Sequence, residues 1–96
     1  MNELVVGKLY QLKSATGNIS LREAPSWYEP GVKTFPLKNE TAFQVIKVIT
    51  NYDCTWINKS QRMPDRLSIH ILTSDGFSGW MNLYDVNLYI FEELVQ

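Results

Sequence analysis

Hydrophobic and polar residues alternate most regularly between positions 67 and 86. Leu67, Ile69 and Ile71 would share one face of a strand, because successive side chains along a strand point to opposite faces. An Asp-Gly pair at 75–76 then allows a tight turn, since this pair is favoured where the backbone needs a positive φ angle. A second apolar run begins at Phe77. The pattern predicts a β-hairpin around which the rest of the chain is arranged.

Four further segments are predicted to be strands. The clearest strand is Thr41–Thr50, which consists mainly of β-branched and aromatic residues. Its middle departs from strict alternation, which indicates either burial on both faces or a β-bulge. Gly79 in the hairpin indicates a bulge, a bend or the close passage of another backbone segment. The other predicted strands are Leu4–Lys13, Ile19–Arg22 and Leu88–Val95.

Two long loops separate these strands. The segment Pro25–Pro36 holds three prolines, which exclude a helix or a central strand. The segment Asn51–Arg66 is irregular, although Tyr52, Cys54 and Trp56 alternate as in an extended arm. No segment shows sustained helical periodicity. We predict an all-β protein, a small barrel or sandwich of five to six short antiparallel strands with two long loops.

The composition fits a folded domain. With 96 residues the chain is long enough for a single domain, residues 1–96, with one modest core. No apolar run approaches the roughly 20 residues that cross a bilayer, and the N-terminus lacks the features of a signal peptide. We therefore expect a cytoplasmic protein that does not contact a membrane. The net charge of −1 argues against general nucleic-acid binding, because electrostatics supplies most of that affinity.

The order of these features resembles a bacterial Src-homology-three domain. In that family a short strand ends in an arginine and a Pro-Ser step. A long loop and a strand follow, then a hairpin whose second arm has a Gly-Trp pair after an Asp-Gly turn. The matching segments are Leu21–Ser26, Thr41–Val48 and Asp75–Met81, and Leu83–Phe91 falls where the family closes its barrel. The resemblance covers roughly residues 9–94 and implies a Src-homology-three-like barrel.

The sequence departs from the family pattern in positions that concern ligand binding more than the fold. Ala24 and Glu40 stand where glycines are usual, and the segment 51–66 is longer than typical. Eukaryotic Src-homology-three domains bind proline-rich peptides in an aromatic groove. The tryptophan pair and the proline that build this groove are missing around Trp80 and Tyr84. We therefore do not expect a proline-rich ligand.

Large aromatic residues are candidates for a binding surface, because tryptophan and tyrosine contribute much of the energy of protein interfaces. Trp27 and Tyr28 lie in the proline-containing loop, where they either form such a surface or fold back as a lid on the barrel. Trp80 and Tyr84 follow the hairpin turn and either cover the second face of the sheet or line a groove. Trp56 lies in the second loop.

The end of the second loop is basic. Lys59, Arg62 and Arg66 lie there together with Asp65. Basic residues near an aromatic residue such as Trp56 can hold an acidic peptide or a nucleic-acid strand. The alternative is an ordinary solvated loop tip.

The chain offers no evident catalytic or metal-binding set. Cys54 and His70 are the only thiol and imidazole, and nothing in their spacing indicates a nucleophile and its base. These two residues cannot supply the four ligands of a structural zinc ion. The glycines do not form a phosphate-binding loop either. We expect neither enzymatic activity, nor a metal, nor a cofactor.

We interpret the chain as a small intracellular binding module that engages another protein. The residues expected to make that contact are Trp27, Tyr28, Trp56, Trp80 and Tyr84. Compact proteins of this kind occur among the accessory proteins of phages and other mobile elements, and we expect such an origin. One alternative is a cell-wall module that binds peptidoglycan, as the bacterial resemblance implies, although that role normally requires export. A second alternative is nucleic-acid binding through the 59–66 loop.

We expect a monomer or a weak homodimer. The last predicted strand offers an unpaired edge, which invites pairing with a second copy. Glu92 and Glu93 in the same strand would oppose that pairing through charge repulsion.

Overall fold

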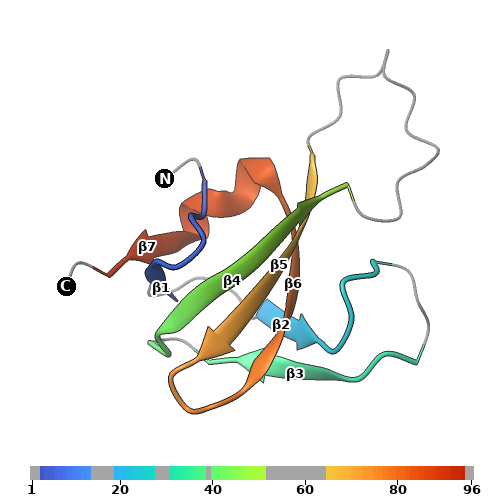
Figure 1. Ribbon diagram of the computed structural model, residues 1–96, viewed down its shortest axis with the longest axis horizontal. Coiled ribbons are helices and arrows are strands. Elements are labelled where there is room, and N and C mark those ends of the chain that lie inside the picture. Colours follow the sequence, from blue (N-terminus) through green and yellow to red (C-terminus); the bar gives the residue numbers. More distant parts are fainter. Residues whose placement is uncertain (1–2, 14–18, 28–30, 39, 52–64, 95–96) are drawn as a thin grey trace.

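A computed structural model describes residues 3–13, 19–27, 31–38, 40–51 and 65–94. Within these residues the chain forms one antiparallel sheet that curls into a half-barrel (Figure 1). Neighbouring strands follow the order β3-β2-β6-β5-β4-β1-β7. The elements in chain order are β1 (Leu9–Leu12), β2 (Ile19–Arg22), β3 (Thr34–Leu37), β4 (Phe43–Thr50), β5 (Arg66–Thr73), β6 (Ser78–Tyr84), the 3-10 helix η1 (Asp85–Ile90) and β7 (Phe91–Glu93). The predicted all-β class is confirmed.

The predicted hairpin is confirmed as β5 and β6. Seven residue pairs join the two strands, from Arg66 opposite Tyr84 to Leu72 opposite Ser78. Gly76 in the turn has a φ angle of 93°, a conformation that suits glycine because it has no Cβ. The Asp-Gly pair therefore predicts the position of the hairpin turn correctly.

The prediction of five to six strands is wrong, because the described residues form seven. The additional strand is β3, which lies at the end of the segment predicted as a proline-containing loop. Pro36 is tolerated there because β3 is an edge strand that pairs only with β2 among the described strands. The prolines did exclude a central strand, as predicted, but they did not exclude an edge strand.

The closing segment also differs from its prediction. Residues 88–90 were predicted as part of a last strand, but they belong to the 3-10 helix η1, and β7 begins at Phe91. Leu88 on η1 and Phe91 at the start of β7 are both buried in the core. The described residues contain no helix that is long and apolar enough to span a membrane.

Strand β4 contains the predicted irregularity. Its pairing with β5 shifts register between Val45 and Lys47, which is a β-bulge. Val45 is buried, whereas the extra residue Ile46 is exposed. Of the two alternatives for this strand, the bulge is therefore confirmed.

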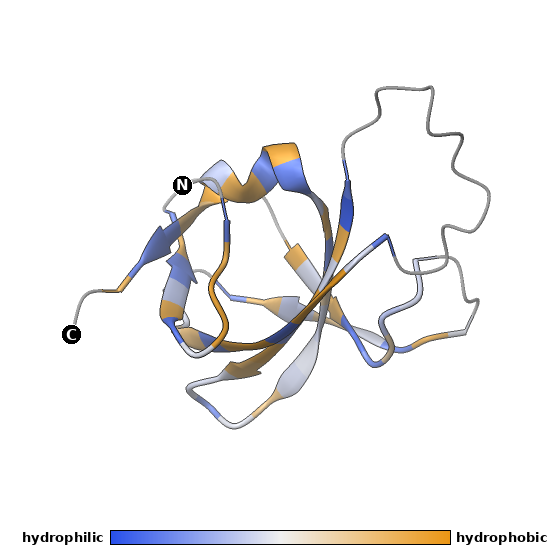
Figure 2. Cartoon of the chain, turned by 45° about the horizontal axis from the view of Figure 1, so that its top comes forward, coloured by the Kyte–Doolittle hydropathy of each residue, from blue (hydrophilic) through white to orange (hydrophobic). Residues whose placement is uncertain are grey.

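The core fills the concave side of the curled sheet. The hairpin contributes Ile69, Ile71 and Met81, all of them fully buried. The ring of Phe43 meets the ring of Phe91 edge-on at a centroid distance of 5.5 Å. Figure 2 shows hydrophobic and hydrophilic residues alternating along the strands, as expected for a sheet with one face toward the core.

Gly79 lies where β2 passes closely over β6. A Cβ atom added at Gly79 would lie 3.0 Å from the Cβ of Leu21 and 3.3 Å from the carbonyl oxygen of Arg22. Of the three alternatives considered for this glycine, the close passage of another backbone segment is the one that the structure shows. Any larger residue would force β2 away from β6.

We expect the substitution Gly79→Ala to lower the free energy of unfolding by about 1–3 kcal/mol, because it overpacks a tight contact. In a domain of this size each kcal/mol corresponds to about 4–8 °C in melting temperature. Thermal unfolding followed by circular dichroism measures the shift. Ser78→Ala in the neighbouring, exposed position is the control. A Gly79→Ala protein that melts with the wild type would contradict this account of the β2–β6 contact.

Candidate functional site

The hairpin strands have a second face that points away from the core, which we call the outer face. Four pairs of residues lie directly opposite each other on it, because register is preserved along both strands. These pairs are Arg66 with Tyr84, Ser68 with Asn82, His70 with Trp80, and Leu72 with Ser78. The outer face therefore brings together two of the aromatic residues predicted to bind a partner, Trp80 and Tyr84.

The loop after β2 crosses one half of the outer face and is fastened to it. The Ser68 hydroxyl donates a hydrogen bond to the Pro25 carbonyl oxygen at 2.8 Å. The Ser26 carbonyl oxygen accepts two hydrogen bonds, from Arg22 Nε at 3.1 Å and from Asn82 Nδ2 at 3.3 Å. Ser68 is completely buried as a result. Three hydrogen bonds thus hold the backbone that leads into the next residue, Trp27.

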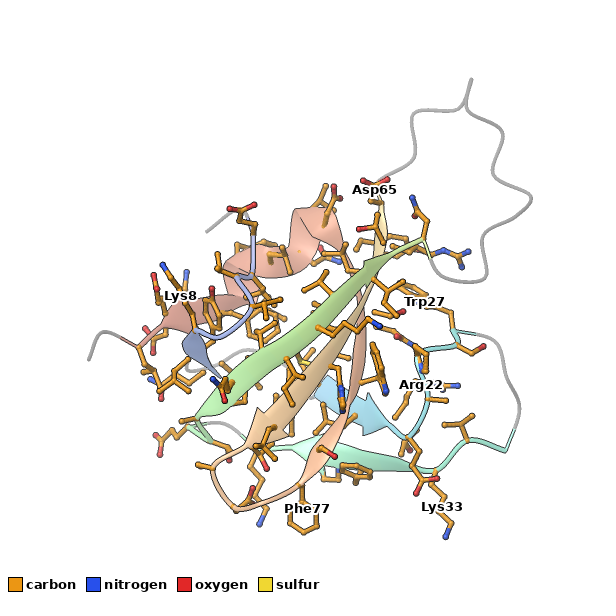
Figure 3. All side chains as sticks on the ribbon, in the orientation of Figure 1. Lys8, Arg22, Trp27, Lys33, Asp65 and Phe77 are labelled. Carbon is orange, nitrogen blue, oxygen red and sulfur yellow. The ribbon has the colours of Figure 1, made fainter. Side chains whose placement is uncertain are left out.

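Trp27 lies on the outer face between an arginine and a tyrosine. Its ring centroid is 5.2 Å from that of Tyr84, and the Arg66 guanidinium carbon lies 5.1 Å from the Trp27 ring centroid. The arginine is only 4% exposed, so its charge is directed at the indole rather than into solvent. We call Trp27, Arg66 and Tyr84 the Trp27 cluster. Figure 3 shows Trp27 beside the central strands, on the same side as Arg22.

Trp27 covers part of the outer face beside Tyr84 and is half-buried there rather than sealed. A cavity of about 330 Å³ lies against it. The residues lining this cavity are Ile19, Ser20, Arg22, Trp27, Thr34, Asn82 and Leu83. The cavity gives a ligand access to one side of the indole.

Among the described residues, three covered side-chain atoms have no hydrogen-bond partner. Trp27 Nε1 and Asn82 Oδ1 belong to residues that line this cavity, and the third atom is Asp85 Oδ1. Each unpaired buried group costs about 1–3 kcal/mol, so a partner that supplied hydrogen bonds here would recover free energy on binding. The indole N–H requires an acceptor such as a peptide carbonyl, whereas the two oxygens require donors. A peptide backbone offers both.

Trp80 has a different neighbour from Trp27. Its ring stacks on that of His70 with a centroid distance of 4.6 Å and an interplanar angle of 12°. Both residues are half-buried, so the stack is partly open to solvent. His70 thus contacts an aromatic residue, whereas Cys54 lies outside the described residues.

Several predicted site residues lie outside the described residues. They are Tyr28, Trp56, Lys59 and Arg62. Arg66 is the one basic residue of the second loop's end that lies within the described residues, and it belongs to the Trp27 cluster. In the described part of the chain no three His, Cys, Asp or Glu side chains gather in a way that could hold a metal ion.

A second hollow, at the turn end of the hairpin, was not predicted from the sequence. This groove has a volume of about 760 Å³, and its lining includes Phe35 and Phe77, whose rings are in tilted contact with a centroid distance of 6.2 Å. Phe77 is 59% exposed because β6 begins one residue later, at Ser78. Its position directly after the Asp-Gly turn was the available signal that it need not face the core. Figure 3 shows Phe77 far from Trp27.

Comparisons of the chain with protein-family models, with curated protein sequences and with solved structures found no significant match.

We expect the substitution Ser68→Ala to cost about 1 kcal/mol of stability, because the Pro25 carbonyl loses its hydrogen-bond donor at a covered position. Urea unfolding monitored by tryptophan fluorescence measures this loss. Ser78→Ala, at an exposed position of the same face, should change stability by no more than about 0.5 kcal/mol. Equal stability of the two variants would show that the Ser68–Pro25 hydrogen bond does not hold the loop.

Proposed function

We propose that the chain is a Src-homology-three-like domain that binds an extended peptide segment of another protein at the Trp27 cluster. The order of elements supports the fold assignment. The segment between β1 and β4 is long and contains the β2–β3 hairpin. A second hairpin, β5–β6, follows β4. The 3-10 helix η1 then leads into β7, which pairs with β1 at the edge of the sheet opposite β3.

The observation that carries the functional proposal is the position of Trp27. The indole is held between Arg66 and Tyr84, is only half-buried, and borders a cavity. Tryptophan, tyrosine and arginine are the residue types that dominate binding energy at protein interfaces. The three hydrogen bonds behind Trp27 fix its loop before a partner arrives, which reduces the entropy lost on binding.

A protein partner is favoured over a nucleic acid at this cluster. Arg66 is covered and is engaged with the indole, so it is poorly placed to reach a phosphate backbone in solvent. The net charge of −1 adds no general attraction for a polyanion. The unpartnered indole N–H and side-chain oxygens match the donors and acceptors of a peptide backbone.

A selection experiment tests the proposal. The full chain is immobilised and presented with a phage-displayed library of random peptides of about twelve residues, long enough to cross the face at roughly 3.3 Å per residue. We expect enrichment of peptides whose affinity falls about thirtyfold or more in the Trp27→Ala variant, the effect of removing a dominant interface residue. Fluorescence anisotropy with labelled peptides measures the affinities.

Phe77→Ala is the matched control, because it removes an exposed aromatic side chain at the far end of the hairpin. It should leave peptide affinity unchanged. Circular dichroism must show that both variants remain folded, and Trp27→Phe provides a milder substitution if alanine disturbs the loop. Peptides that bind the Trp27 variants and the wild type equally well would refute the proposed site.

A further inference from the structure

One row of side chains crosses four strands on the outer face. Arg22 on β2 lies opposite Trp80 on β6, and Trp80 lies opposite His70 on β5. His70 in turn lies opposite Lys47 on β4. We call these four residues the cross-strand row. The row has a stacked aromatic pair in its centre and a cation at each end.

The strands that form this face contain no acidic residue. Every residue of strands β2 to β6 is described, and none of them is Asp or Glu. The described carboxylates lie outside these five strands, although Glu23, Asp65 and Asp85 directly adjoin the ends of β2, β5 and β6. The charged side chains within the five strands are therefore all basic, in a chain whose net charge is −1.

Apolar side chains flank the row on its open side. Ile46, the extra residue of the bulge, and Leu72 are each 41% exposed. The other half of the outer face is covered by the loop that holds Trp27. The row therefore runs along the border between the covered and the open half, beside two exposed aliphatic residues.

We infer that the peptide segment bound by this face is acidic, with two carboxylates that flank an apolar residue. This inference rests on the proposed function and specifies its partner. Charge complementarity selects the carboxylates, which pair with Lys47 and Arg22, and the apolar residue contacts the His70–Trp80 stack.

The geometry sets the spacing of the two carboxylates. The row spans three strand-to-strand steps of about 4.8 Å, or roughly 14 Å. An extended peptide rises about 3.3 Å per residue, so the carboxylates belong about four residues apart. The Arg22 end of the row is held by its hydrogen bond to Ser26, whereas Lys47 is exposed and can adjust to the ligand.

The peptides selected on the wild-type chain test this inference. We expect them to contain Asp or Glu above the library frequency, in pairs about four positions apart. We expect Lys47→Glu to weaken their binding about fivefold or more, the effect of losing and reversing one partly exposed charge. Affinity should also fall as NaCl rises from about 0.05 to 0.5 M, because salt screens exposed charges.

Lys13→Glu is the matched control, since it makes the same charge change at an exposed lysine just after β1. Tyr10 lies opposite Phe43 in the antiparallel pairing of β1 with β4, so Lys13 and Lys47 extend from that pair in opposite directions. At roughly 3.3 Å per residue this separation exceeds a Debye length of about 10 Å, and peptide affinity should stay within about twofold of the wild type. Equal weakening by the two substitutions would show a general charge effect and would overturn the assignment of Lys47.

The remaining outcomes separate this inference from the function on which it rests. Selected peptides that depend on Trp27 but show no acidic excess would overturn the inference and leave the binding module intact. Failure to enrich any Trp27-dependent peptide would overturn both. A single-stranded oligothymidine that binds the face more tightly than the selected peptides would identify a nucleic-acid ligand and would also overturn the inference.

Discussion

The close contact between β2 and β6 at Gly79 shapes the rest of the molecule. Without a side chain at this position, Leu21 and the backbone of Arg22 approach β6 closely enough for the two strands to pair. The chain that leaves β2 beside this contact returns across the outer face of the hairpin. The positions of Trp27 and of the covered half of that face both follow from this crossing.

Burial on both sides distinguishes β5 from the other strands. Ile69 and Ile71 point into the core, whereas Arg66 and Ser68 are covered by the returning loop. Buried polar groups need partners, and here the loop backbone and the Trp27 ring provide them. The contacts that provide partners for the polar side chains of β5 therefore also hold the loop that carries Trp27 in position. Stability and the proposed recognition depend on one set of contacts.

The charges are separated along the sheet. The edge formed by β7 has Glu92 and Glu93, whereas the central strands have only basic charged side chains. This separation gives a nearly neutral chain one face suited to an anionic segment. It also gives the two faces of the hairpin distinct roles, with the aliphatic face in the core and the aromatic and basic face outside.

The hairpin and the all-β class were predictable, because they depend on local alternation and turn residues. The bulge in β4 and the close passage at Gly79 were each among the alternatives that the local pattern left open, and the tertiary structure decided between them. Strand β3 was not, since Pro36 is compatible with a strand only at an edge, and edges are assigned by the whole sheet. The short 3-10 helix was missed because its apolar spacing also fits a strand. The aromatic residues of the site were recognisable as candidates, but their grouping was not. Trp27, Arg66 and Tyr84 are far apart in the chain, and only the register of β5 with β6 and the crossing of the loop bring them into contact.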